Sequence, residues 1–335
     1  MNRKEFVKVA GIVAGFFILS SIGLLDEARA DTYPSDTLTW ICHSKPGSGF
    51  DINARGFVPF LTKYLKEVAP GGKGGDINVK NVTQAMGRKA YTDIYNAKPD
   101  GYTIGDINIG HISQFIFDAD KPPFDVTKFA WLIRTAMTTR LLIANKKGLA
   151  TWEEMVAASK KAPLKWSVGT MGSSGHIESA IVAETAGLQA KFLPAGGPPE
   201  QINAILRGDV QVAWISEDSV KSLAEAKEVN VLVSFTEERL FPDVPTIKEK
   251  GYPQVIPYVG NHRLTIGPPN FDANAKTVLL AAAKKAMADP EYLAFCKKIG
   301  LTPAPLLGKD VEDLMARYIK FYTDMAPTLK KYLTY

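Results

Sequence analysis

The strongest constraint on the fold is that short apolar runs alternate with segments spaced as amphipathic helices. The pattern predicts a strand at residues 38–42, then a helix over 52–68 and a second strand at 77–82. This alternation favours an α/β fold with parallel sheets. Further strands are predicted at 102–105, 131–133, 141–144, 166–168, 210–215 and 229–235, and further helices at 91–97, 176–186, 202–206, 273–288, 290–299 and 311–333, with Thr151 as the N-cap of another.

Two proline-containing stretches suggest how the chain is divided. Residues 241–257 form the longest irregular segment, and residues 121–124 precede the strand at Trp131. One early and one late connection suit a chain that crosses twice between two lobes. We therefore predict one lobe from residues 31–131 and 255–335, and a second lobe from residues 132–254.

The N-terminus has the layout of an export signal. A basic start is followed by an apolar stretch over 9–25, and Ala28-Arg29-Ala30 is a small-x-small cleavage pattern. We predict cleavage after Ala30 and a periplasmic location; a permanent membrane anchor is the alternative. Residues 2–8 resemble a twin-arginine motif whose second arginine is lysine, which leaves both the Sec and the Tat route open.

Charge and cysteine content exclude several classes of protein. The 40 basic and 35 acidic side chains give a net charge of +5, and no run of five basic residues occurs. A nucleic-acid partner is therefore not expected. Two cysteines, Cys42 and Cys296, are too few for a disulfide scaffold or a structural zinc site. They are expected to be buried thiols, or to pair after export.

Three loops, each after a predicted strand and before a helix, are the candidate binding site. Helix N-termini at the carboxyl ends of strands offer free N–H groups, and glycines let a ligand approach the backbone. Because hydroxyls and N–H groups outnumber carboxylates there, a small carboxylate or other anion is the expected ligand. Turn formation and helix capping are the alternative roles. The residues are Ser44, Lys45, Gly47, Ser48, Gly49, Phe50 and Asp51 in the first loop, Thr170, Ser173, Ser174 and His176 in the second, and Gly196 and Gly197 in the third.

Enzyme motifs are incomplete. Gly47-x-Gly49 has Ile52 where a dinucleotide fingerprint needs its third glycine, and residues 172–175 are one residue short of a nucleophile elbow. The four histidines are far apart, so no metal and no cofactor is predicted. An exported hydrolase using Ser173 or Ser174 with His176 is the alternative to a binding protein.

Several segments together resemble the substrate-binding proteins of tripartite tricarboxylate transporters, also called Bug receptors. The segments are Tyr33-Pro34-Ser35, Pro46-Gly47-Ser48-Gly49-Phe50-Asp51, Lys98-Pro99-Asp100-Gly101-Tyr102-Thr103, Gly172-Ser173-Ser174-Gly175-His176, Pro194-Ala195-Gly196-Gly197 and the long run from Phe241 to Pro253. The resemblance implies a type II periplasmic-binding-protein fold with a ligand cleft and hinge between two α/β lobes. It also implies a carboxylate ligand and membrane permease subunits as partners. We expect a monomer; a sensor for a signalling partner is an alternative role.

Departures from the family pattern affect the expected ligand. Residues 81–87 lack most of the glycines common there, so Met86 or Arg88 is expected to project into the cleft. Ile215 stands where the family often has aspartate, followed by Ser216. Lys45 and Arg88 favour an anion, and Phe50 and Trp214 suit an aliphatic or aromatic body.

Overall fold

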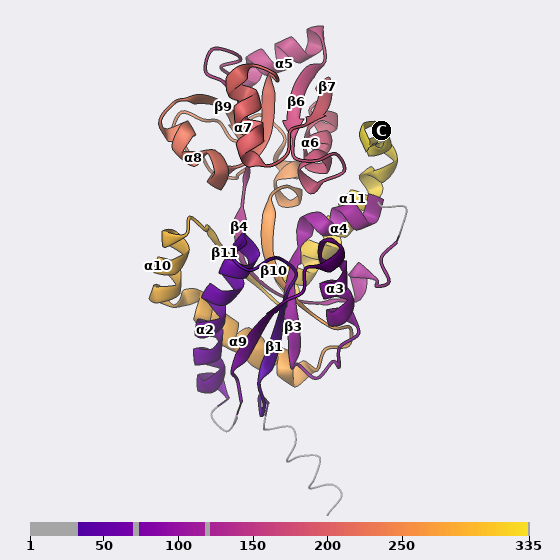
Figure 1. Ribbon diagram of the computed structural model, residues 1–335, viewed down its shortest axis with the longest axis vertical. Helices are drawn as coiled ribbons and strands as arrows, with labels where there is room; N and C mark the ends of the chain where they lie inside the picture. The colour runs from indigo at the N-terminus through magenta and orange to yellow at the C-terminus, as the bar shows by residue number, and fades with distance from the viewer. Residues whose placement is uncertain (1–32, 70–73, 118–120, 334–335) are drawn as a thin grey trace, which may run out of the picture.

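The computed structural model describes residues 33–69, 74–117 and 121–333, and Figure 1 shows two lobes, one above the other along the long axis. Each lobe is built on one β-sheet. The signal peptide predicted for residues 1–30 lies outside the described residues.

The first lobe contains a six-stranded sheet in the order β11-β4-β10-β3-β1-β2. Strand β1 is parallel to β2 and β3, whereas β10 is antiparallel to β3 and β4, and β11 to β4. The prediction of parallel strands is therefore confirmed for β1 with β2 and β3 and is wrong for β10 and β11, because the chain that returns from the other lobe enters this sheet in the opposite direction. The strands are β1 Leu38–Cys42, β2 Ile77–Asn81, β3 Thr103–Asn108, β4 Ala130–Thr138, β10 Asn261–Gly267 and β11 Pro303–Leu307.

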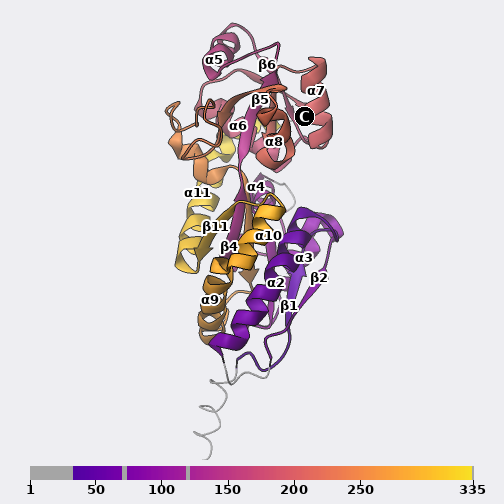
Figure 2. The ribbon, with the colours of Figure 1, turned by 90° about the vertical axis from the view of Figure 1, so that its left-hand side faces the viewer.

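Helices cover both faces of this sheet (Figure 2). On one face α2 (Gly49–Val68), α9 (Ala273–Ala288) and α10 (Pro290–Lys298) bury an apolar cluster that includes both cysteines, which are free thiols. On the other face, α3 (Arg88–Tyr95) and α4 (Ile109–Phe117) contribute to a larger cluster that continues into the second lobe. A helix needs such a buried stripe, because isolated helices are marginal in water.

The second lobe has a five-stranded sheet in the order β7-β6-β8-β5-β9. Here too β5 is antiparallel to both its neighbours, β8 and β9. The N-cap prediction for Thr151 is confirmed, since its hydroxyl accepts from the N–H of Glu154 at the start of α5. The elements are β5 Arg140–Asn145, β6 Leu164–Val168, β7 Ala190–Pro194, β8 Val212–Ser216, β9 Val229–Ser234, α5 Trp152–Lys161, α6 Ser174–Thr185, α7 Pro198–Arg207 and α8 Glu217–Glu225.

The chain crosses between the lobes at two neighbouring places. Strand β4 ends at Thr138 and β5 begins at Arg140, while the return follows the 3₁₀ turn Pro253–Tyr258 and enters β10. The two crossings pack tightly, because a Cβ at Gly260 would lie 2.8 Å from the Thr138 carbonyl oxygen. Two adjacent extended segments of this kind form a hinge.

A third link between the lobes is not covalent. Helix α11 (Lys309–Leu333) begins beside β4 and ends against α6. There Lys331 and the Tyr332 hydroxyl bind the Glu184 carboxylate at 2.7 and 2.8 Å. The C-terminal helix thus lies along both lobes.

Strand pairing keeps β4 in the first sheet as far as Thr138, whereas the predicted lobe limit lies at residues 131–132. Pairing within one sheet does not by itself define where a lobe ends, so the lobe limits at 131–132 and 254–255 stay a prediction. The predicted ranges 38–42 and 273–288 match β1 and α9. Strand β7 was expected before the third loop but was given no range, and strands β10 and β11 and helices α4 and α8 were not predicted. Strand β10 carries His262 and Arg263, which break the apolar pattern of a strand.

Candidate functional site

Each lobe directs a helix N-terminus toward the other lobe. Helix α2 begins at the end of the first lobe that faces the second lobe (Figure 1). Helix α6 of the second lobe begins at Ser174, which packs against Gly110 of α4 in the first lobe. The packing is tight, because a Cβ at Gly110 would lie 2.6 Å from the Ser174 hydroxyl oxygen. The first and second candidate loops therefore both lie at the boundary between the lobes.

The first loop is shaped from within by Asp51, which is 3% exposed. Its carboxylate accepts from the Gly47 N–H at 2.8 Å, from Arg55 at 2.9 Å and from the Asn81 amide at 2.8 Å. Burial raises the pKa of Asp51, but these donors together hold it below its usual value. These bonds give Asp51 a role in folding the loop, and its contact with a ligand stays a prediction.

A cation that the sequence analysis missed lies against this loop. The Arg263 guanidinium stacks on the Phe50 ring, with its carbon 4.1 Å from the ring centroid. Its Nη2 is 3.2 Å from where a Cβ at Gly49 would stand, so the guanidinium lies close to the backbone at the start of α2. Burial lowers the pKa of Arg263, while Asp218 of the second lobe and Asp106 raise it.

A buried polar cluster lies below the first loop. The His43 ring and backbone N–H both bind the Asp106 carboxylate, and the Trp40 indole reaches the same group at 3.4 Å. His111 bonds the Tyr91 hydroxyl at 2.7 Å. Burial and the neighbouring His43 lower the pKa of His111 to about 3, so its ring stays neutral. The cluster supports the loop from the core side.

The second loop is also satisfied internally. The Ser173 hydroxyl caps α6 by accepting from the His176 N–H at 3.3 Å, and the Gly172 N–H donates to the His176 ring at 3.0 Å. His176 is fully buried against Phe192. His176 therefore packs inside the second lobe, and its contact with a ligand stays a prediction. Its ring makes no hydrogen bond to a serine hydroxyl among the described residues, so a Ser–His catalytic pair is not formed.

Trp214 and Ser216 belong to a buried ion-pair network in the second lobe. Arg140 donates to the Glu178 carboxylate at 2.7 Å and contacts the Ser216 hydroxyl, and the Trp214 indole donates to Glu178 at 3.1 Å. Burial raises the pKa of Glu178, and Arg140 together with the backbone of the hinge residue Gly260 opposes that rise. The network ties α6 to both crossing segments.

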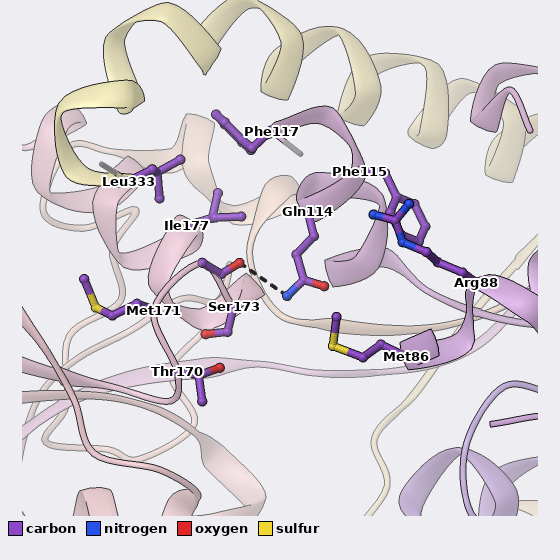
Figure 3. A pocket seen from close by; sticks show the side chains of 11 residues that line it. Met86, Arg88, Gln114, Phe115, Phe117, Thr170, Met171, Ser173, Ile177 and Leu333 are labelled. Atoms are coloured by element: carbon purple, nitrogen blue, oxygen red, sulfur yellow. Dashed lines mark hydrogen bonds between the residues drawn. The ribbon is translucent and has the colours of Figure 1, made fainter. Parts of the chain in front are cut away.

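A cavity of about 360 Å³ opens between the lobes (Figure 3). The Gln114 amide crosses it to the Gly172 carbonyl at 3.3 Å. Met86 is 76% exposed on its rim, and the Arg88 guanidinium lies 5.1 Å from the Phe115 ring centroid. The lining is mixed apolar and polar: Met86, Arg88, Gln114, Phe115, Phe117, Thr170, Met171, Gly172, Ser173, Ile177 and Leu333.

The structure brings only part of the predicted site together. Met86, Arg88, Thr170 and Ser173 share the cavity, whereas the first loop does not line it. Lys45 is exposed on that loop, and the Ser44 and Ser48 hydroxyls bond each other at 2.6 Å.

The third loop lies further out, at the edge strand β7. Its Gly196 N–H donates to the Gly169 carbonyl at 3.2 Å, next to the second loop. At Gly197 a Cβ would lie 3.0 Å from the Glu200 carboxylate oxygen of the helix that follows. Neither glycine lines the cavity between the lobes.

Residues 33–69, 74–117 and 121–333 contain no group of three or more metal-ligating side chains. None of the helices in these ranges has the length and apolarity needed to cross a bilayer.

Two α/β lobes, a double crossing and a cavity between them are the features of the type II periplasmic-binding-protein fold. The family model described as "Tripartite tricarboxylate transporter family receptor" matches residues 73–321. The chain belongs to this family of solute-binding receptors, as the sequence resemblance implied.

Curated relatives are distant but extend over most of the chain. The Cupriavidus necator "UPF0065 protein in gbd 5'region" is 25% identical over 335 residues, covering 96% of this chain and 95% of its own. Protein BugT of Bordetella pertussis is 22% identical over 265 residues, covering 76% of this chain and 77% of its own.

Solved structures share the fold. A TctC solute-binding protein from Polaromonas, without ligand, superposes with a TM-score of 0.77 at 22% identity, over 89% of this chain and 100% of that one. A Rhodopseudomonas palustris protein with adipate has a TM-score of 0.64 at 20% identity, over 90% and 98%. MatC from the same species, with bound malate, has a TM-score of 0.62 at 20% identity, over 89% and 99%.

Proposed function

We propose that this receptor is a periplasmic protein that captures a small carboxylate and delivers it to a tripartite tricarboxylate-type membrane transporter. The observation that carries the proposal lies at the N-terminus of α2, where the Arg263 guanidinium approaches Gly49 and Lys45 is exposed on the preceding loop. Helix N-termini and cations both attract anions. Adipate and malate in structural neighbours support the same ligand class.

Binding is proposed to close the two lobes about the paired crossings near Gly260. A ligand bridging the first and second loops contacts both lobes only when they are closed, so its binding energy favours the closed state. The closed, liganded form is then what the permease subunits recognise. No bond is made or broken in this role, and we propose a non-enzymatic, monomeric receptor.

A thermal-shift and calorimetric screen of mono-, di- and tricarboxylates and aromatic acids tests the ligand class. A ligand that binds only the native state raises the melting temperature, and the matching amides serve as uncharged controls. We expect at least one acid to bind and its amide to fail. A broad panel without any responding acid would contradict the carboxylate assignment.

Two variants test the loops. We expect Lys45→Ala and Ser174→Ala each to weaken binding of the acid found in the screen; unchanged affinity in both would remove these loops from the site. Hydrolysis of an ester by the wild type that disappears in Ser174→Ala would instead favour the enzyme alternative.

Export and transport have separate tests. Expression of the full chain in a Gram-negative host should yield a periplasmic form whose N-terminal residue is Asp31. Uptake of the same acid by cells carrying the permease subunits should require this receptor. A form retaining residues 1–30, or uptake independent of the receptor, would overturn these parts of the proposal.

A further inference from the structure

Among the described residues, Arg263 is a buried cation without an anionic partner. It is 8% exposed, and its Nε finds no hydrogen-bond partner in that part of the chain. Across residues 33–69, 74–117 and 121–333, its single specific contact is the stacking on Phe50. Burying a charge without a partner is costly, and buried charges in proteins are normally paired.

The acidic groups near Arg263 are already engaged or too far for an ion pair. Asp106 binds His43 and Trp40. Asp218, at the start of α8, is exposed and accepts from the Ser219 hydroxyl at 3.2 Å. Arg140 carries the same charge as Arg263 and lowers its pKa, and Arg140 is itself bound to Glu178. Asp218 and Asp106 therefore act on the charge of Arg263 from a distance, and no carboxylate among the described residues forms an ion pair with it.

The guanidinium is directed at an open helix end. Nη2 lies 3.2 Å from the Cβ position of Gly49, the first residue of the 20-residue helix α2. The N-cap Ser48 makes no side-chain capping bond, and Gly49 is exposed. The N–H groups in the first turn of a helix have no acceptor inside the helix. The first-turn N–H groups of α2 and the Arg263 guanidinium are therefore donors that lie close together at an accessible place.

We propose that Arg263 and the N-terminus of α2 form an anion-binding subsite that takes one carboxylate of the ligand. A guanidinium can donate two parallel hydrogen bonds to a carboxylate, which gives both charge and orientation. The inference rests on the proposed function and deepens it: the ligand must place a full negative charge here. The amide of the same acid would leave Arg263 buried and unpaired, so it is rejected.

The first test needs no knowledge of the ligand. Crystals of the protein soaked in sodium bromide should show an anomalous peak between the Arg263 guanidinium and the first turn of α2. The peak should vanish in Arg263→Met. A wild-type crystal without bromide at this place would overturn the subsite.

The second test uses the best acid of the screen, with adipate and malate included. We expect Arg263→Met to weaken its binding about 100-fold or more, and Arg263→Lys to weaken it less, because charge is kept but the fork is lost. Lys191→Met, which removes the same charge from exposed strand β7, is the matched control and should stay within about twofold. Circular dichroism establishes that each variant is folded.

The outcomes separate the two proposals. Equal affinity of wild type and Arg263→Met for an acid overturns the subsite and leaves the carboxylate receptor intact. Bromide at Arg263 with no acid bound supports the subsite and contradicts the carboxylate function. A loss in Asp218→Asn as large as in Arg263→Met would make Arg263 an interlobe ion-pair residue and overturn the subsite.

Discussion

The two helix N-termini at the lobe boundary differ in how their polar groups are satisfied. At α6 the Ser173 hydroxyl caps the helix, and the nearby Arg140 is paired with Glu178. At α2 the N-cap Ser48 makes no capping bond, and Arg263 has no acidic partner among the described residues. In the second lobe the charge of Arg140 is therefore paired next to the crossing segments. In the first lobe the charge of Arg263 has no ion-pair partner among the described residues. Recognition of an anion is therefore expected to be concentrated in the first lobe.

The largest expected effect comes from breaking the pair in the second lobe. Glu178→Ala leaves Arg140 buried and unpaired, as Arg263 is, and should lower the free energy of unfolding by about 3–5 kcal/mol. Urea denaturation measures the change. The double variant Arg140→Met with Glu178→Leu should recover much of the loss, because no buried charge remains. If Glu178→Ala were as stable as wild type, the network would not hold the hinge region.

The buried His176 makes the second loop sensitive to acid. Burial lowers the pKa of His176 to about 4, below its ordinary value of 6.5. The unfolded chain therefore binds a proton first as the pH falls, so the stability from the neutral ring is complete above pH 6.5 and is lost as the pH falls toward 4. Between pH 6.5 and 4 we expect the free energy of unfolding to fall by about 1.4 kcal/mol per pH unit, the contribution of one proton.

Urea denaturation at several pH values measures this slope. His176→Gln retains an acceptor for the Gly172 N–H but does not titrate, so its profile should be flatter than that of wild type. His111 and His262, whose pKa values burial also lowers, to about 3, continue to titrate in both proteins and provide the common background. Parallel profiles would contradict a buried neutral His176.

The smallest effect compares the two N-caps directly. Ser173→Ala removes a capping hydrogen bond and should cost about 1 kcal/mol of stability. Ser48→Ala removes no capping bond, only the hydroxyl bond to Ser44, and should cost less, about 0.5 kcal/mol. Thermal denaturation of both variants without ligand provides the comparison. Equal losses would mean that α2 is capped in solution and would weaken the contrast between the lobes.

Strand–loop–helix order could be predicted because it is a local property. The strand at 38–42 and the N-cap Thr151 follow from apolar runs and capping chemistry within a few residues. The positions of the three loops after strands follow from the same pattern. What could not be predicted is which side chain of a loop turns inward. His176 is buried because α6 is covered on nearly all sides by other elements.

The two arginines that distinguish the lobes carry no local signal. Arg140 begins β5 and Arg263 lies within β10, so each reads as a charged residue beside an apolar strand. Their partners, or the absence of partners, come from residues far away in the chain: Glu178 for Arg140, and Phe50 with Gly49 for Arg263.

The amino-acid sequence by itself determined the alternation of strands and helices, the loops that follow the strands, and the family. These depend on backbone propensity, hydrophobic periodicity and short motifs, which act over neighbouring residues. Only the tertiary structure decided that strands β4, β5 and β10 run antiparallel to neighbouring strands, that Asp51 and His176 are internal, and that Arg263 meets the start of α2. The physical reason is that burial and charge pairing depend on which distant segments the fold places side by side.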